Sequence, residues 1–150
     1  GYQAITSGQI PAVELPDGAG VARLIAGSYG GQTGPARTFT PLSVWDLRIR
    51  AGKTARLELP AGWNTALVVI EGTVLVAGDA LARESQLVVL EAEGSAVEIE
   101  ANNDATVLLL SGEPIAEPIV GYGPFVMNTQ QEIVDAVNDF NSGKFGRMSA

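Results

Sequence analysis

The chain of 150 residues contains no histidine and no cysteine. These two residues are the usual ligands of zinc, copper and iron, and histidine is the usual base beside a serine or threonine nucleophile. Their absence argues against a tightly held transition metal and against a catalytic triad. It also excludes disulfides, which fits a reducing compartment, and we expect a cytoplasmic location.

Positive charge and long apolar runs are also scarce. Nine Lys and Arg residues stand against 17 Asp and Glu residues, for a net charge of −8. Direct binding of nucleic acid is therefore not expected, because phosphate contacts need clustered basic side chains. No run approaches the roughly 18 apolar residues of a membrane-spanning helix, so no membrane partner is expected. The sequence opens at Gly1 without a methionine, and we expect Gly1 to mark a boundary within a longer protein.

Short segments of alternating polarity fill most of the chain. In the clearest one, Trp45, Leu47 and Ile49 fall on one face and charged residues on the other, which is the period of a half-buried strand. Three apolar runs without alternation, 67–70, 87–90 and 107–110, predict strands that are covered on both faces. Short strands separated by close turns, such as the one at Glu93-Gly94, predict an antiparallel sandwich or barrel. The predicted strands are 21–26, 44–50, 56–59, 66–70, 73–77, 86–90, 96–100 and 106–110.

One helix is predicted, near the end of the chain. Thr129 and Glu132 have the spacing of a capping box, in which each residue satisfies a backbone amide of the other. An apolar stripe follows, and Gly143 is placed to end the helix. We expect a single domain, 1–150, made of a barrel, 1–111, and a tail with the helix, 112–150. The stripe consists of Ile133, Val134, Val137 and Phe140.

The tail carries a family signature. Residues 112–119 read Gly-Glu-Pro-Ile-Ala-Glu-Pro-Ile, and residues 123–129 read Gly-Pro-Phe-Val-Met-Asn-Thr. This stretch closely resembles the C-terminal signature of the pirin family, which consists of two-domain cupin proteins. Tyr2-Gln3 and Ile10-Pro11 extend the resemblance to the start of the chain. The resemblance implies an all-β, cupin-like antiparallel β-barrel or sandwich of the jelly-roll type with one C-terminal α-helix.

The pirin resemblance also implies that the two domains of a pirin have different roles. Pirins hold an iron-type metal in their N-terminal domain; some members have quercetin 2,3-dioxygenase activity, and others act as nuclear cofactors of transcription regulators. This chain resembles the other half. It is therefore expected to hold no cofactor and to catalyse no reaction alone, whereas a longer parent protein is expected to act as a flavonol (quercetin) dioxygenase or a transcription cofactor.

The stretch 57–72 is similar to the hairpin that supplies His-x-His and a Glu in metal-binding cupins. The histidine pair would fall near Glu58 and Pro60, and the Glu near Asn64, while a later strand offers only Val107, Leu108 and Leu109. Proline and aliphatic side chains cannot bind a metal, so we predict neither catalytic nor metal-binding residues. The remaining alternative is a carboxylate-only site for a hard cation. The spacing of the carboxylates along the sequence does not favour such a site. Its members would be Asp46, Glu58 and Glu71.

Two other features are candidates for contacts. Trp63 follows a Pro-x-Gly turn and either lines a barrel mouth or belongs to the core. The Gly-rich segment 27–34 matches neither a phosphate loop nor a dinucleotide fingerprint, and is either a flexible connection or a contact for a neighbour. A further apolar segment either packs the helix onto the barrel or faces a missing domain. It consists of Gly123, Pro124, Phe125, Val126, Met127 and Asn128.

Our hypothesis is a non-catalytic, metal-free C-terminal cupin domain that packs against a metal-bearing N-terminal pirin domain. Weak self-association through an uncovered apolar surface would follow for the isolated chain. The alternative is a protein that acts on its own and uses the empty cupin pocket. It would be either a small-molecule-binding barrel or an enzyme. A third class is a protein-interaction module.

Overall fold

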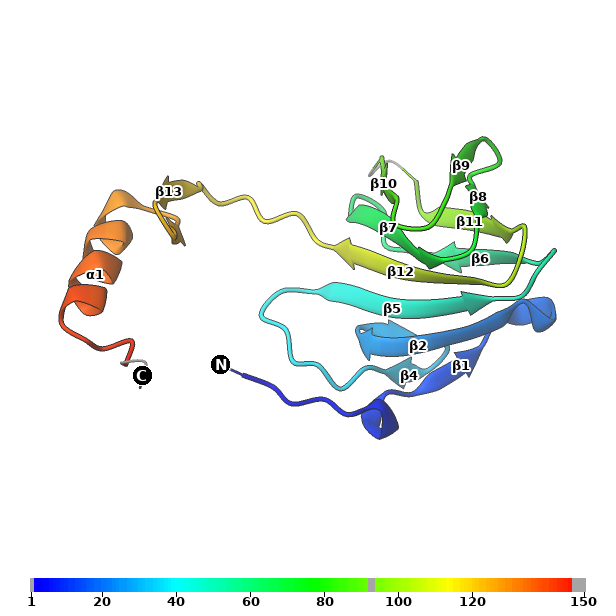
Figure 1. Cartoon of the computed structure of the whole chain (residues 1–150), viewed down its shortest axis with the longest axis horizontal. Helices are drawn as coiled ribbons and strands as arrows, with labels where there is room; N and C mark the ends of the chain where they lie inside the picture. The colour runs from blue at the N-terminus through cyan, green and yellow to red at the C-terminus, as the bar shows by residue number, and fades with distance from the viewer. Residues whose placement is uncertain (1, 92–93, 147–150) are drawn as a thin grey trace. The chain divides into compact units, whose positions relative to one another are not determined.

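The computed structural model describes residues 2–91 and 94–146, so the turn predicted at Glu93 lies outside the described residues. The chain divides after Pro114 into two compact units, 1–114 and 115–150. The first unit contains the large majority of the strands (Figure 1). No described helix is long and apolar enough to cross a membrane.

The first unit is a sandwich of two antiparallel sheets (Figure 1). One sheet has six strands in the order β1 (Ala12–Glu14), β2 (Gly20–Ala26), β5 (Leu42–Ile49), β12 (Ala105–Gly112), β7 (Asn64–Glu71) and β10 (Leu87–Leu90). The other has four, in the order β6 (Thr54–Glu58), β11 (Ala96–Ala101), β8 (Val74–Val76) and β9 (Ala80–Ala82). The all-β prediction is confirmed as a sandwich; the described strands do not close into a barrel.

Alternation along the strands builds the core between the sheets. On β12, Val107 and Leu109 are fully buried against the four-stranded sheet, where Leu57 and Ile99 are fully buried in turn. Burial of such side chains stabilises the fold by about 1.5–3 kcal/mol each. The charged residues of β6 and β11 point outward, and Arg56 donates to Glu98 across the strand pair.

The prediction that the three apolar runs are covered on both faces is wrong for this chain. In the runs 67–70 and 107–110 only alternate residues are buried, and in the run 87–90 none is fully buried. Ile70, Leu87 and Val89 expose 51%, 60% and 74% of their surface. The outer face of the six-stranded sheet is therefore open.

Short elements that carry no strong periodicity complete the first unit. They are two 3₁₀ turns, η1 (Ser7–Gln9) and η2 (Pro16–Gly18), and a two-residue hairpin, β3 (Ser28–Tyr29) with β4 (Gln32–Thr33), inside the Gly-rich segment. At the start of β2, Gly20 has φ +146°, and a Cβ there would lie 1.9 Å from the carbonyl oxygen of Arg48. Only glycine fits where β2 passes this close to β5.

The second unit is a hairpin followed by a helix. The hairpin pairs β13 (Val120–Tyr122) with β14 (Phe125–Met127), and α1 spans Gln130–Asn141. The predicted capping box is confirmed: the Glu132 amide donates to Thr129 Oγ1, and the Thr129 amide donates to the Glu132 carboxylate. Gly143, at φ +79°, ends the helix as predicted.

Candidate functional site

The positions at which a cupin carries its metal ligands hold no converging donors here. Glu58 and Asn64 are exposed, at the end of β6 and the start of β7, and Pro60 between them is exposed as well. Val107 and Leu109 face the core, whereas Leu108 faces outward. These residues do not fit a transition metal, because none of those near the core offers a ligand atom.

The three carboxylates of the alternative cation site lie on different parts of the sandwich. Glu58 is on the four-stranded sheet, whereas Asp46 and Glu71 are on β5 and β7 of the six-stranded sheet. Asp46 is already paired with two arginines. In the part of the chain that the structure describes, no three acidic side chains come together in a way that could hold a metal ion.

Apolar side chains gather on the outer face of the six-stranded sheet in the first unit. Strand pairing places its outward side chains in cross-strand rows, and such neighbours on one face lie within about 5.5 Å of one another. One row runs through Val89, Ala66, Leu110 and Val44, and the next through Leu87, Val68 and Leu108. We call these seven residues the outer apolar face. Uncovered patches of this kind mark interaction sites.

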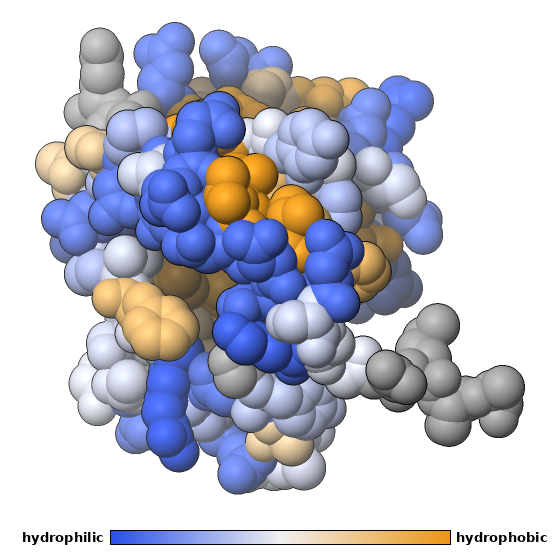
Figure 2. Space-filling view, turned by 90° about the vertical axis from the view of Figure 1, so that its left-hand side faces the viewer, coloured by the Kyte–Doolittle hydropathy of each residue, from blue (hydrophilic) through white to orange (hydrophobic). Residues whose placement is uncertain are grey.

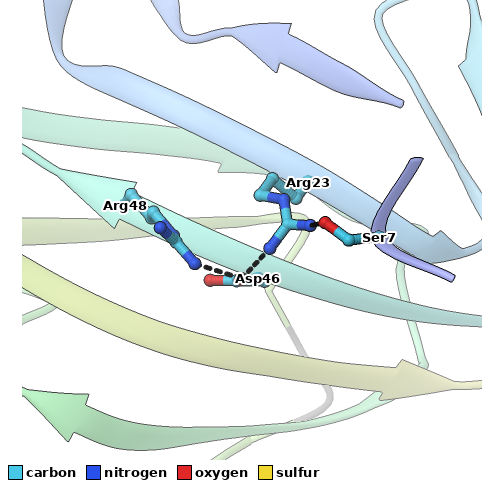
Figure 3. Close-up of polar contacts among 4 residues, drawn as sticks. All are labelled: Ser7, Arg23, Asp46 and Arg48. Carbon is cyan, nitrogen blue, oxygen red and sulfur yellow. Dashed lines mark hydrogen bonds and ion pairs between the residues drawn. The ribbon is translucent and has the colours of Figure 1, made fainter. Parts of the chain in front are cut away.

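An ion-pair network borders the outer apolar face (Figure 3). Asp46, paired directly with Leu108 on β12, accepts from Arg23 at 3.1 Å and from Arg48 at 3.3 Å, both through Oδ2. Arg23 also donates to the hydroxyl of Ser7 at 2.8 Å. The second oxygen of Asp46, Oδ1, is buried and has no donor within the described residues.

Trp63 lies at the end of the sandwich where β7 begins, and its half-buried ring lines two cavities there. The larger cavity, of about 440 Å³, is also lined by the second tryptophan of the chain, Trp45. The Gly-rich segment contributes Gly27 and Gly34 to the same wall. Sequence reasoning named Trp63 as a candidate and placed Trp45 on one strand face with Leu47 and Ile49. That face is the core face, and Trp45 is 2% exposed there.

The segment Gly123–Asn128 forms the hairpin turn and β14 in the second unit. Phe125 packs on Phe140 and Phe145, with ring centroids 6.3 Å apart in each pair, so it holds the hairpin against the helix. Val126, by contrast, is 66% exposed.

Just beyond the helix, the Lys144 ammonium donates a hydrogen bond to the Asp139 carboxylate, and this hydrogen bond raises the pKa of Lys144.

A second apolar surface lies on the helix itself. A groove of about 280 Å³ runs beside Ile133, Val134 and Val137 of α1, with Tyr122 of β13 on its wall. The space-filling view in Figure 2 shows hydrophobic side chains gathered among hydrophilic ones. Sequence periodicity identified the helical stripe, but not that Val134 and Phe140 stay more than half exposed.

Comparisons with known proteins agree with this description. Residues 44–146 match the model of the pirin C-terminal cupin domain. A Pseudomonas aeruginosa protein, named as a candidate quercetin 2,3-dioxygenase, is 51% identical over 146 residues, which cover 97% of this chain and 51% of that protein. Mouse pirin is 35% identical over 150 residues, with 97% and 51% covered.

Among solved structures, the quercetin 2,3-dioxygenase of Acinetobacter baumannii superimposes with a TM-score of 0.90 at 43% identity. The match covers 99% of this chain and 52% of that one. The chain thus spans about half the length of the relatives it matches. It belongs to the pirin family, which it matches through the C-terminal cupin domain.

Proposed function

We propose that this chain is the metal-free, non-catalytic half of a two-cupin protein, and that its outer apolar face docks on a metal-bearing N-terminal half. The observation that carries the proposal is the outer apolar face itself. Leu87 and Val89 expose 60% and 74% of their surface on an edge strand, next to two further strands with apolar outward residues. Water contact of such a face is unfavourable by roughly 25 cal/mol per Å².

The relatives indicate the occupant. Each is about twice as long as this chain, so a second domain of similar size accompanies the matched half. The apolar runs of β7, β10 and β12 have the composition of strands covered on both faces. A second domain on the outer side would supply the missing cover, and the Arg23–Asp46–Arg48 network would form its polar rim.

The same proposal assigns the chemistry to the other half. Two relatives carry the name of a quercetin 2,3-dioxygenase, and the residues of this chain at the cupin ligand positions do not fit a metal. We therefore propose that any flavonol-oxidising activity of a full-length protein depends on metal ligands outside this chain.

A cytoplasmic location belongs to the same proposal and rests on the absence of cysteine. The lack of a nucleic-acid partner also belongs to it and rests on the net charge of −8.

The second unit supports docking through a second contact. Its 36 residues (115–150) are too few to bury a core of their own, and of the described ones Ile133 and Ala136 are the buried apolar residues. We propose that the exposed side of the segment Gly123–Asn128, above all Val126, contacts the same N-terminal half. Phe125 is a poor test position, because its removal would disturb the aromatic cluster.

The experiment is a binding titration between this chain and a separately produced N-terminal pirin domain, followed by sedimentation. Val89→Glu should weaken binding at least tenfold, because it would bury a charge without a partner. Leu81→Glu is the matched control: Leu81 is 51% exposed on β9 of the opposite sheet, and its variant should bind normally. Absence of binding, or equal loss in both variants, would overturn the proposal.

An activity assay separates docking from catalysis. The chain alone should not oxidise a flavonol, and the mixture with the N-terminal half should. Activity of the chain alone, with no added domain, would favour the stand-alone enzyme instead.

A further inference from the structure

The connection between β12 and β13 repeats a four-residue pattern. Residues 113–116 read Glu-Pro-Ile-Ala, and residues 117–120 read Glu-Pro-Ile-Val. Every residue from 113 to 119 is exposed, and Ile115 and Ile119 expose 63% and 82% of their surface. The connection belongs neither to the core of the sandwich nor to the outer apolar face.

Two prolines hold this connection extended. A proline disfavours the helical region for the residue before it, so Glu113 and Glu117 are directed to extended backbone conformations. Pro114 and Pro118 themselves have φ fixed at about −65° and carry no N–H group. Isoleucine is among the residues that strands favour most. The connection therefore has the backbone of a strand, although no described strand pairs with it.

The repeat gives the connection two unequal edges. In an extended strand, the N–H and C=O groups of one residue point to one edge, and those of the next residue point to the other. Pro114 and Pro118 share an edge, which lacks a donor at both positions, and prolines occur in sheets where that side stays unpaired. The Pro118 carbonyl on this edge already accepts from the side-chain amide of Asn128 at 2.9 Å.

The opposite edge carries a donor at every position. Its first amide, that of Glu113, donates to the carbonyl of Pro41 at 3.1 Å. The amides of Ile115, Glu117 and Ile119 follow at every second residue, and none of them has a backbone acceptor within the described residues. Their side chains share one face, where two exposed isoleucines flank a glutamate. A strand edge of this kind is a template for pairing with another strand.

We propose that residues 115–119 add as a strand to a sheet edge of the N-terminal half, through the amides of Ile115, Glu117 and Ile119. Such recognition takes its affinity from main-chain hydrogen bonds and its specificity from alternate side chains. The inference rests on the proposed function, in which a second domain of similar size accompanies the matched half. A cupin half built like this one ends its sheets in edge strands, as β10 and β9 do here.

Amide hydrogen exchange of the ¹⁵N-labelled chain, with and without an unlabelled N-terminal pirin domain, tests the pairing. Exchange at Ile115, Glu117 and Ile119 should slow about tenfold or more in the complex, whereas exchange at Ala116 should slow less than about twofold. The amide of Ala116 points to the proline edge, so this alternation marks a paired edge. Burial without pairing would slow all four amides. Equal protection of Ala116, or no protection at any of them, would overturn the proposal.

Two proline substitutions separate the edges. Glu117→Pro removes a donor from the pairing edge and should weaken binding of the N-terminal domain about tenfold, because a carbonyl of the partner strand loses its donor. Ala116→Pro is the matched control: it removes a donor from the other edge and should bind within about twofold of the unaltered chain. Glu117→Ala keeps the amide and should weaken binding less than Glu117→Pro. Equal loss in the two proline variants would overturn the proposal.

The outcomes distinguish strand addition from docking of the outer apolar face. Binding that Val89→Glu weakens and Glu117→Pro leaves unchanged would overturn strand addition alone. Absence of binding by the unaltered chain would overturn both. Protection of the same amides in the concentrated chain without the added domain would assign this edge to a second copy, and would overturn the N-terminal half as its partner.

Discussion

Leu109 and Leu110 are neighbours on β12, and they should respond very differently to truncation. Leu109 is 0% exposed between the sheets, whereas Leu110 is 36% exposed on the outer apolar face. Leu109→Ala removes buried atoms and leaves a cavity, so we expect a loss of about 3 kcal/mol in the free energy of unfolding. Leu110→Ala removes partly hydrated atoms next to solvent and should cost about 1 kcal/mol.

Urea unfolding followed by tryptophan fluorescence measures this difference, because both tryptophans lie in the first unit. The dependence of the unfolding free energy on urea concentration should be the same in both variants, so that midpoints can be compared directly. Equal losses for the two leucines would refute the reasoning. They would mean that the outer face of β12 is already covered in the isolated chain, for example by self-association.

The remaining predictions concern local structure and metal. Thr129→Ala should destabilise the second unit by about 1 kcal/mol, because the helix loses its N-terminal cap. Amide exchange should then rise in the second unit but not in β7. Thr129→Ser, which keeps a hydroxyl group, is the control. Gly20→Ala should lower the free energy of unfolding, measured by thermal unfolding, by more than about 2 kcal/mol, because the new Cβ would clash with the Arg48 carbonyl. Gly52→Ala is the control: its Cβ would meet no atom within 4 Å, and the loss should be about 1 kcal/mol. After dialysis against a weak chelator, the chain should retain no stoichiometric iron, copper, nickel or zinc by elemental analysis; one retained equivalent would contradict this.

Local signals in the sequence predicted local structure well. The capping box at Thr129 and Glu132 and the stop at Gly143 were found from spacing, because each depends on residues within one or two helical turns. The strand β5 was found from its alternation. Short strands such as β1 and β13 were missed, because three residues show no clear period.

The apolar runs show a different kind of failure. Residues 107–110 predicted cover on both faces, yet the chain covers only the side of Val107 and Leu109. Sequence composition reflects every surface that a strand buries in the complete molecule, including surfaces buried by other domains. The mismatch on β7, β10 and β12 is what our docking proposal explains.

A row of three buried hydroxyl side chains at one end of the sandwich was beyond sequence reasoning for a geometric reason. Ser43, Thr65 and Ser111 are 22 and 46 residues apart along the chain, and only the register of β5, β12 and β7 brings them into line. Each hydroxyl alone is unremarkable in a strand. The row becomes visible once the strand order is known.

The docking of the outer apolar face on an N-terminal cupin half is tested most directly by methyl NMR. Leucine and valine methyl groups of this chain are labelled, and an unlabelled N-terminal pirin domain is added. We predict that the shifted signals belong to the outward residues Leu87, Val89 and Leu110, with little change at Leu57 and Val97 of the four-stranded sheet. Shifts centred on the four-stranded sheet, or no shifts at saturating concentrations, would contradict the account.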